Sequence, residues 1–123
     1  MTHCILLVDD NRVIRHVLRG MFEAVGCVCS ESENGRDALA DARRLHPDLI
    51  VLDYSMPVMN GLEAAPLLRK VLPRTPILMF TMFATDVLAE QALAAGVTAV
   101  FSKDQAATHL LPKAESLLNS TSP

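Results

Sequence analysis

Short apolar runs alternate along this chain with longer segments of helical period, and that alternation predicts the fold class. Four runs, at 5–8, 49–52, 77–80 and 97–101, are β-branched or bulky and lack a polar face, as expected of strands covered on both sides. A shorter and weaker candidate lies at 28–32. The segments between the runs carry apolar residues every three or four positions, which is typical of amphipathic helices. The order βαβαβαβαβα therefore predicts a parallel sheet with right-handed crossovers.

The clearest helix is expected between the first two strands. Asp10 or Asn11 can cap its start, and Gly26 stands where a left-handed residue commonly ends a helix. Its apolar stripe is expected to face inward and consists of Val13, Ile14, Val17, Leu18, Met21, Phe22 and Val25. The other helices are expected at about 35–45, 61–71, 85–95 and 110–118.

Two prolines fall inside these predicted helices. Pro66 removes a backbone hydrogen bond from the third helix, which predicts a kink or a late start. Pro112 is expected either in the first turn of the last helix or just before its well-formed part.

Five strands in this arrangement favour the flavodoxin-like, doubly wound (βα)5 fold with strand order 2-1-3-4-5. Ligands of such sheets bind beyond the carboxyl ends of the strands, where the order reverses between the first and third strands. The chain has 123 residues, enough for one domain with a real core. We expect that domain at 1–118 and a tail or linker start at 119–123.

Composition narrows the function classes. The formal net charge is −3, which argues against nucleic-acid binding by this domain alone. No apolar run approaches the roughly 18 residues that span a membrane, and the first residues lack the basic region of a signal peptide. Three cysteines are too few for a disulfide framework. We expect a cytoplasmic protein with reduced thiols.

Polar groups suited to chemistry stand where four of the predicted strands end. Asp9 and Asp10 follow the first strand, Asp53 the third, Thr81 the fourth and Lys103 the fifth. Taken singly, each could be an ordinary turn, cap or surface residue. Because parallel strands share one carboxyl edge, these groups are expected to converge. Carboxylates there can gather Mg²⁺, an Asp can attack phosphorus, and Lys and Thr can contact a phosphoryl oxygen.

These residues also match a known signature, which the chain carries along nearly its whole length. The chain resembles the receiver domain of two-component response regulators. The pieces of the signature are Leu7-Val8-Asp9-Asp10-Asn11, Asp53-Tyr54-Ser55-Met56-Pro57-Val58-Met59-Asn60-Gly61, Phe80-Thr81 and Phe101-Ser102-Lys103.

The resemblance implies that Asp53 is a phosphoacceptor, which takes a phosphoryl group from a histidine kinase or phosphotransfer protein. It implies that Mg²⁺ is held by Asp10, Asp53 and the backbone carbonyl of Ser55, with Asp9 acting through a bound water. Self-directed phosphoryl transfer and dephosphorylation are then expected, rather than turnover of an external substrate.

The resemblance further implies a two-state switch. Lys103 would pair with the phosphoryl oxygens, Thr81 would be drawn toward them, and Phe101 would turn inward behind Thr81. The change would reshape the surface of the fourth helix, fifth strand and fifth helix, roughly residues 84–118. That surface would carry dimerisation or partner binding.

Two positions depart from the common pattern of the family. Asp104 stands where many receivers have a proline, and a cis bond before a non-proline residue costs about 2.5–4 kcal/mol. Met82 replaces a usually small residue and could crowd the entry to Asp53. The sequence Phe-Ser-Lys-Asp looks closest to the branch with LuxR-type helix-turn-helix output domains.

Two other functions remain open from the sequence. One is a binding scaffold without phosphorylation, a pseudo-receiver, which Met82 favours weakly. The other is an aspartyl phosphatase of the haloacid-dehalogenase type. That type needs a second Asp two residues after the nucleophile, and Ser55 stands there, which argues against it.

Overall fold

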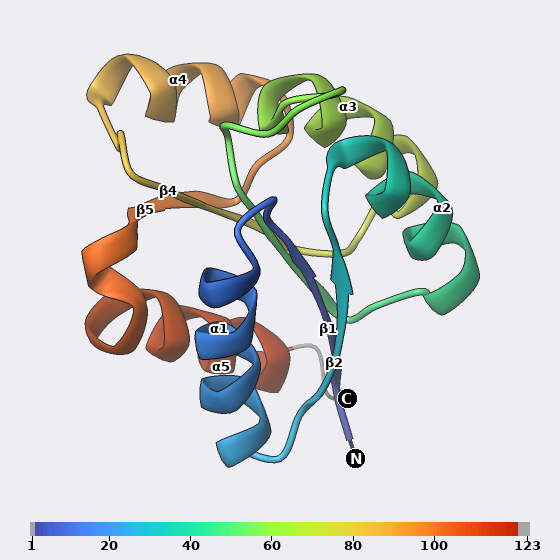
Figure 1. The fold of residues 1–123 in the computed structure, drawn as a ribbon, viewed down its shortest axis with the longest axis vertical. Helices are drawn as coiled ribbons and strands as arrows, with labels where there is room; N and C mark the ends of the chain where they lie inside the picture. The colour runs from blue at the N-terminus through green and yellow to red at the C-terminus, as the bar shows by residue number, and fades with distance from the viewer. Residues whose placement is uncertain (1, 121–123) are drawn as a thin grey trace.

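Five parallel strands form one sheet in the order β2-β1-β3-β4-β5, which confirms the predicted doubly wound, flavodoxin-like topology (Figure 1). The structure is a computed structural model and describes residues 2–120. The strands are β1 (Cys4–Val8), β2 (Val28–Ser32), β3 (Leu49–Leu52), β4 (Ile77–Thr81) and β5 (Ala99–Ser102). Because β1 pairs with both β2 and β3, the order reverses beside the carboxyl ends of β1 and β3.

Helices cover both faces of the sheet, as Figure 1 shows. On one face lie α1 (Arg12–Ala24) and α5 (Leu111–Ser120). On the other lie α2 (Gly35–Leu45), α3 (Gly61–Val71) and α4 (Asp86–Ala94). None of the helices within the described residues is both long and apolar enough to cross a membrane.

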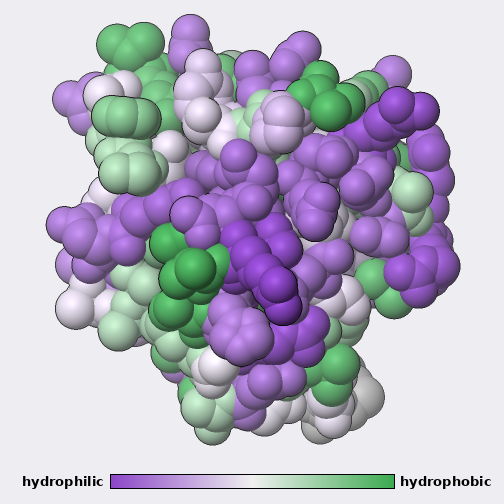
Figure 2. Space-filling model, viewed as in Figure 1, coloured by the Kyte–Doolittle hydropathy of each residue, from purple (hydrophilic) through white to green (hydrophobic). Residues whose placement is uncertain are grey.

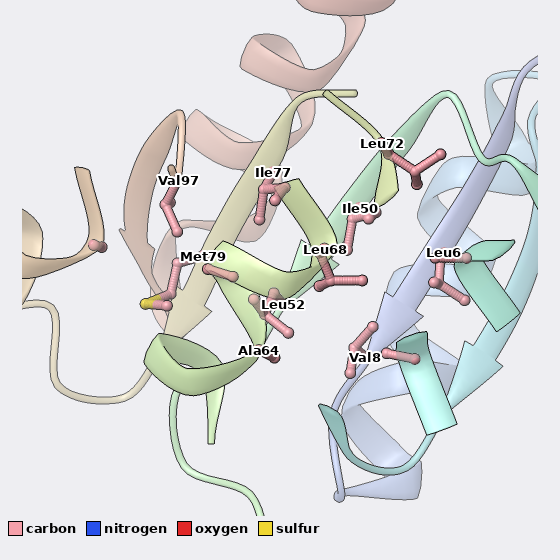
Figure 3. Packing of buried hydrophobic residues seen from close by; sticks show 14 of the residues in the cluster. Leu6, Val8, Ile50, Leu52, Ala64, Leu68, Leu72, Ile77, Met79 and Val97 are labelled. Carbon is pink, nitrogen blue, oxygen red and sulfur yellow. The ribbon is translucent and has the colours of Figure 1, made fainter. Parts of the chain in front are cut away.

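Alternating side chains of the central strands build one core on each face of the sheet. In β1, Leu6 and Val8 pack toward α2 and α3, while Ile5 and Leu7 pack toward α1 and α5. All four are at most 1% exposed, which explains why the strand lacks a polar face. Figure 3 shows the first of these cores. Its labelled side chains are Leu6, Val8, Ile50, Leu52, Ala64, Leu68, Leu72, Ile77, Met79 and Val97.

Side-chain caps fix where the helices begin. The Asn11 carboxamide oxygen accepts hydrogen bonds from the backbone N–H groups of Val13 and Ile14, so Asn11, rather than Asp10, caps α1. Asn60 and Glu63 form a reciprocal capping box at the start of α3. These bonds satisfy N–H groups that have no partner inside their helices.

The predicted inward stripe of α1 is wrong at three of its seven positions. Val13, Val17 and Val25 are 69%, 54% and 43% exposed, whereas Leu18 and Phe22 are at most 2% exposed. A helix that lies on a sheet buries a strip only about 100° wide, and the seven-residue stripe is wider than that. The face of the molecule seen in Figure 2 is hydrophilic over most of its area, with separate hydrophobic patches.

The structure decides between the alternatives predicted for the two prolines and describes part of the expected C-terminal tail. Pro66 lies inside α3, which starts at Gly61, so the alternative of a late start is wrong. Pro112 is the second residue of α5 and thus in its first turn, as expected. Helix α5 continues through Ser120, and residues 121–123 of the predicted tail lie outside the described residues.

The chain between β5 and α5 is irregular in a way that the sequence did not predict. A 3₁₀ turn, η1 (Lys103–Gln105), is followed by a π-helical turn, η2 (Ala106–Leu110). The peptide bond between Lys103 and Asp104 is trans, as are the others among the described residues. Asp104 accepts a hydrogen bond from the Ser102 hydroxyl, which ties the first turn to the end of β5.

Arg69 joins the ends of two helices on the edge of the sheet opposite the strand carboxyl ends. Its guanidinium donates to the carbonyl oxygens of Thr75 at 2.6 Å and Gly96 at 2.7 Å, and to those of Leu72 and Pro73 at 3.2 Å. Leu72 is the C-cap residue of α3, and Gly96 lies just beyond the C-terminus of α4. Pro73 and Thr75 lie in the loop after α3, so one side chain joins the segments that follow both helices.

We predict that Arg69→Met lowers the free energy of unfolding by about 1–3 kcal/mol, because it leaves partly buried carbonyl oxygens without donors. Denaturant unfolding followed by circular dichroism measures the change. Lys70→Met removes an exposed charge one residue along the same helix and is the control, expected within about 0.5 kcal/mol of the unaltered protein. Equal stabilities of the two variants would contradict the role of Arg69.

Candidate functional site

Three carboxylates meet beyond the carboxyl ends of β1 and β3. Asp9 and Asp10 follow β1, Asp53 follows β3, and one oxygen from each lies within 4.8 Å of the others. The backbone N–H of Asp53 donates to the carbonyl of Val8 at 2.9 Å, which extends the strand pairing into the site. Asp9 and Asp53 are buried, whereas Asp10 is exposed. Two of the three charges therefore have little water to stabilise them.

Lys103 reaches this cluster from the end of β5. Its Nζ lies 2.8 Å from Asp9 Oδ2 and 3.3 Å from Asp53 Oδ2. Burial alone would lower the pKa of Lys103, but the hydrogen bond to Asp9 and the charges of Asp53 and Asp9 outweigh it and raise the pKa. The ammonium group stays charged and faces both buried carboxylates.

The carboxyl group of Asp53 is poorly stabilised as an anion. Burial, followed by the neighbouring charge of Asp9, raises its pKa to about 6 from the ordinary value of 3.8. The charge and hydrogen bond of Lys103, together with a backbone hydrogen bond at Ser55, act in the opposite direction but do not compensate. Additional positive charge beside Asp53 would favour its ionised form.

A hollow of about 210 Å³, the volume of several water molecules, opens above the acids. We call it the acidic hollow; it is lined by Asp10, Asn11, Asp53, Ser55, Thr81, Met82, Phe83 and Lys103. Thr81 is 1% exposed, and its hydroxyl oxygen accepts a hydrogen bond from the N–H of Phe83 at 3.4 Å. Met82 is 70% exposed and therefore lies at the rim.

The loop after Asp53 is held close to the site by a glycine. A Cβ on Gly61 would lie 2.4 Å from the carbonyl oxygen of Asp53, so a larger residue would push the two apart. The N–H of Gly61 also donates to the carbonyl of Tyr54 at 2.8 Å. Within the loop, Val58 has a φ of +71°, an unusual and strained conformation for a β-branched residue. The loop keeps Ser55 at the rim of the acidic hollow despite that cost.

Every polar group of Asp9 is already engaged. Its N–H donates to the carbonyl of Ser32 at 3.1 Å, and its Oδ1 accepts from the N–H of Asn11 at 2.8 Å. Its Oδ2 faces Lys103, and its carbonyl oxygen accepts from Arg15 at 2.6 Å. Sequence reasoning missed Arg15, because a polar residue beside an apolar stripe is normally assigned to the solvent side. Its burial, at 7% exposure, is the signal that the structure adds.

The predicted switch residue Phe101 does not line the acidic hollow. It is half-buried in β5, in register with Phe80, and packs against the core beneath α1 and α5. The structure thus brings Asp9, Asp10, Asp53, Lys103 and Thr81 together and leaves Phe101 to one side.

The donor set suits a hard divalent cation. The cluster within the described residues consists of carboxylates alone, which are ligands that Mg²⁺ prefers. Zn²⁺ would favour histidine or cysteine, and neither belongs to the cluster. Asp10 is exposed toward the acidic hollow and Asp53 lies at its floor, so both can offer an oxygen to a cation. The residues present therefore fit Mg²⁺.

The comparisons of this chain with known proteins agree on one family. The response regulator receiver domain family matches residues 5–115 of the chain. A protein-glutamate methylesterase/protein-glutamine glutaminase from Hahella chejuensis is 41% identical over 109 residues, covering 85% of this chain and 31% of that protein. The response regulator protein VraR of Staphylococcus aureus is 36% identical over 109 residues, covering 87% of this chain and 52% of VraR. The chain thus spans about half or less of these relatives.

Solved structures agree with the sequence matches. A two-component response regulator of the LuxR family from Aurantimonas sp. has a TM-score of 0.90 at 29% identity, covering 98% of this chain and 87% of that one. A LuxR-family regulator among the matches confirms the expected likeness to that branch.

We predict that Asp53→Asn stabilises the metal-free protein at neutral pH. The folded protein binds the Asp53 proton more tightly than the unfolded chain, because the pKa is raised from 3.8 to about 6. The free energy of unfolding should therefore fall as pH rises through that window, by on the order of 3 kcal/mol. Asp53→Asn removes this loss, so the two proteins should differ at neutral pH and converge at the acid end of the window.

Urea unfolding in the presence of a chelator, repeated across this pH range, measures the effect. Asp86→Asn removes an exposed carboxylate at the start of α4 and is the control, expected to change stability by less than about 0.5 kcal/mol. A gain in stability that is the same at every pH would refute the explanation from Asp53 ionisation.

Proposed function

The chain belongs to the response regulator receiver domain family, whose members are phosphorylation-controlled signalling switches, and on that basis we propose that Asp53 is its phosphoacceptor. The observation that supports this role best is the position of the Asp53 carboxylate at the floor of the acidic hollow, beside Lys103 and Thr81. Receivers of this family interact with histidine kinases or phosphotransfer proteins. The proposed donor is therefore a phosphohistidine of such a protein.

The transfer forms one bond and breaks another. A carboxylate oxygen of Asp53 attacks phosphorus, the P–N bond to the donor imidazole breaks, and the imidazole nitrogen keeps the electron pair and takes up a proton. The product is an acyl phosphate on Asp53. A pKa of about 6 leaves Asp53 largely ionised at neutral pH, so it can act as the nucleophile. Attack of water on the acyl phosphate then releases inorganic phosphate and restores the carboxylate.

Lys103 and Thr81 recognise the transferred group. Lys103 is closer to Asp9, at 2.8 Å, than to Asp53, at 3.3 Å. It can therefore keep its Asp9 contact while donating to an oxygen of the phosphoryl group. The Thr81 hydroxyl, which lines the acidic hollow, can donate a second hydrogen bond.

We assign the cation to Asp10, Asp53 and the backbone carbonyl of Ser55, with Asp9 acting through a bound water. The engagement of both Asp9 carboxylate oxygens, by Asn11 and Lys103, supports an indirect role for that residue. Mg²⁺, when bound, supplies positive charge that offsets the carboxylates and the phosphoryl oxygens.

The proposed output follows from Thr81. A hydroxyl drawn toward the phosphoryl group would move the end of β4 and release its hydrogen bond from the N–H of Phe83. Phe101, half-buried beside Phe80, would then turn further inward. The surface of α4, β5 and α5, at residues 84–118 of the proposed 1–118 domain, would change shape and dimerise or bind a partner. The net charge of −3 disfavours direct binding of nucleic acid by this surface.

Acetyl phosphate tests the phosphoacceptor. With Mg²⁺ present, we predict that intact mass spectrometry detects one added phosphate, labile to hydroxylamine, and that Asp53→Asn abolishes it. Excess chelator should also abolish it, because three carboxylates otherwise repel an anionic donor. Asp86→Asn, an exposed acid outside the site, is the control and should still be phosphorylated.

Two other outcomes of this experiment would assign the protein a different function. No added phosphate at any donor concentration, together with no response to beryllofluoride, would identify a binding scaffold. Sustained turnover of a phosphate ester would identify an aspartyl phosphatase. Phosphorylation undiminished in chelator would overturn the metal-holding roles of Asp9 and Asp10.

Met82 gives a separate prediction on rate. Its side chain is at the rim of the acidic hollow, so Met82→Ala should speed phosphoryl entry or loss several-fold by widening the opening. Phosphorylation by acetyl phosphate and subsequent dephosphorylation, followed by mass spectrometry, measure both rates. Leu93→Ala truncates another exposed apolar residue, on α4 and outside the lining of the hollow, and is the control. Rates that match the control would show that Met82 does not cover Asp53.

A further inference from the structure

Arg15 is a buried cation outside the lining of the acidic hollow. It lies on the second turn of α1, and its side chain makes two contacts of different kinds. One guanidinium nitrogen, Nη1, donates to the carbonyl oxygen of Asp9 at 2.6 Å, and Nε donates to Glu31 Oε1 at 2.8 Å. The guanidinium thus joins Asp9, the first residue of the acid pair, to Glu31, the penultimate residue of the neighbouring strand β2.

The carbonyl that Arg15 holds belongs to the peptide group between Asp9 and Asp10. A peptide group is planar, so fixing its oxygen also fixes the direction in which the chain leaves toward the Asp10 Cα. The structure fixes the other side of Asp9 through its N–H, which donates to Ser32, and through Asn11, which donates to its side chain. The orientation of the exposed Asp10 side chain therefore depends on the plane that Arg15 holds.

We propose that Arg15 is the positioning residue of the acid pair: by holding the Asp9–Asp10 peptide plane it directs the Asp10 carboxylate toward the cation position. This inference rests on the proposed function, in which Asp10 holds Mg²⁺. Arg15 itself contacts neither the cation nor the phosphoryl group. Partners that orient metal ligands in this way commonly change metal affinity by about 10–100-fold when they are removed.

Glu31 keeps the guanidinium in its orientation. Its two oxygens accept from Arg15 and from Arg19, each at 2.8 Å. Burial would raise the pKa of Glu31, but the hydrogen bonds from both arginines outweigh it and lower the pKa, so the carboxylate stays charged. Arg19 has the same partner as Arg15 and the same charge, but its contacts are with Glu31 and Glu23 rather than Asp9. The chain therefore contains a matched control for the role of Arg15.

The experiment compares Arg15→Met with Arg19→Met. Each variant removes one positive charge and one ion pair to Glu31, and the other arginine remains to pair with that carboxylate. Mg²⁺ is titrated into isotope-labelled protein while the backbone amide signals of Asp10, Asn11 and Asp53 are followed by NMR. We expect Arg15→Met to weaken Mg²⁺ binding by about 10–100-fold and Arg19→Met to leave it unchanged. Equal affinities of the two variants would overturn the proposal.

Hydrogen exchange in the metal-free proteins provides the second measurement. The N–H of Asn11 donates to Asp9 Oδ1, so its exchange rate reports the order of the acid pair without any cation. We expect faster exchange at Asn11 in Arg15→Met than in Arg19→Met. Equal rates would overturn the proposal even if Mg²⁺ binds.

The two measurements also separate this inference from the proposed function. Absence of Mg²⁺ binding by the unaltered protein would refute the cation site, while the exchange comparison would still decide whether Arg15 orders the pair. If Arg15→Met does not fold, Arg15→Met/Glu31→Gln removes the partly freed carboxylate charge as well, and Arg19→Met/Glu31→Gln is its control. The same expectations then apply to that pair.

Discussion

Burial of carboxylates at the ends of β1 and β3, together with their mutual repulsion, is the constraint on which the rest of the site depends. Asp9 and Asp53 are almost fully buried and lie beside the exposed Asp10, within reach of one cation. Isolated buried charges of this kind are strongly unfavourable unless they are paired and hydrogen-bonded. Lys103 supplies one positive charge to two of them, and the raised pKa of Asp53 shows that this is not enough. The folded protein therefore favours any state that adds positive charge there.

The packed core holds the strands that carry these carboxylates rigidly and stabilises the fold in spite of their burial. Strands buried on both faces hold β1 and β3 in register, and the pairing continues from Val8 to Asp53 at the site itself. Close approach of Gly61 to the Asp53 carbonyl fixes the following loop, which retains a strained residue at Val58. At the opposite end of the strands, Arg69 joins the segments that follow α3 and α4. The unfavourable groups are thus confined to one edge of an otherwise well-satisfied structure.

The sequence was sufficient to predict the sheet order and the convergence of Asp9, Asp10, Asp53 and Lys103. Both predictions follow from the order of the apolar runs and from the residues that end them. It was insufficient where tertiary packing overrides local pattern. The valines of α1 have the right spacing for burial, yet the sheet covers a narrower strip. Arg15 on the same helix is buried instead, where it donates to the backbone carbonyl of Asp9. The π-helical turn of η2 has no comparable local signal.

The unequal distances of Lys103 connect this electrostatic imbalance to the proposed switch. Its tighter contact is with Asp9, whose remaining polar groups are fixed by Ser32, Asn11 and Arg15. Its looser contact is with Asp53, which is the group that phosphorylation would alter. A new anionic oxygen near Asp53 would compete for the looser contact and leave the tighter one in place. Lys103, which directly follows β5, would then stay bound to Asp9. The adjustment would fall on Thr81 and the loop that follows it, where the contact to Phe83 is long, at 3.4 Å.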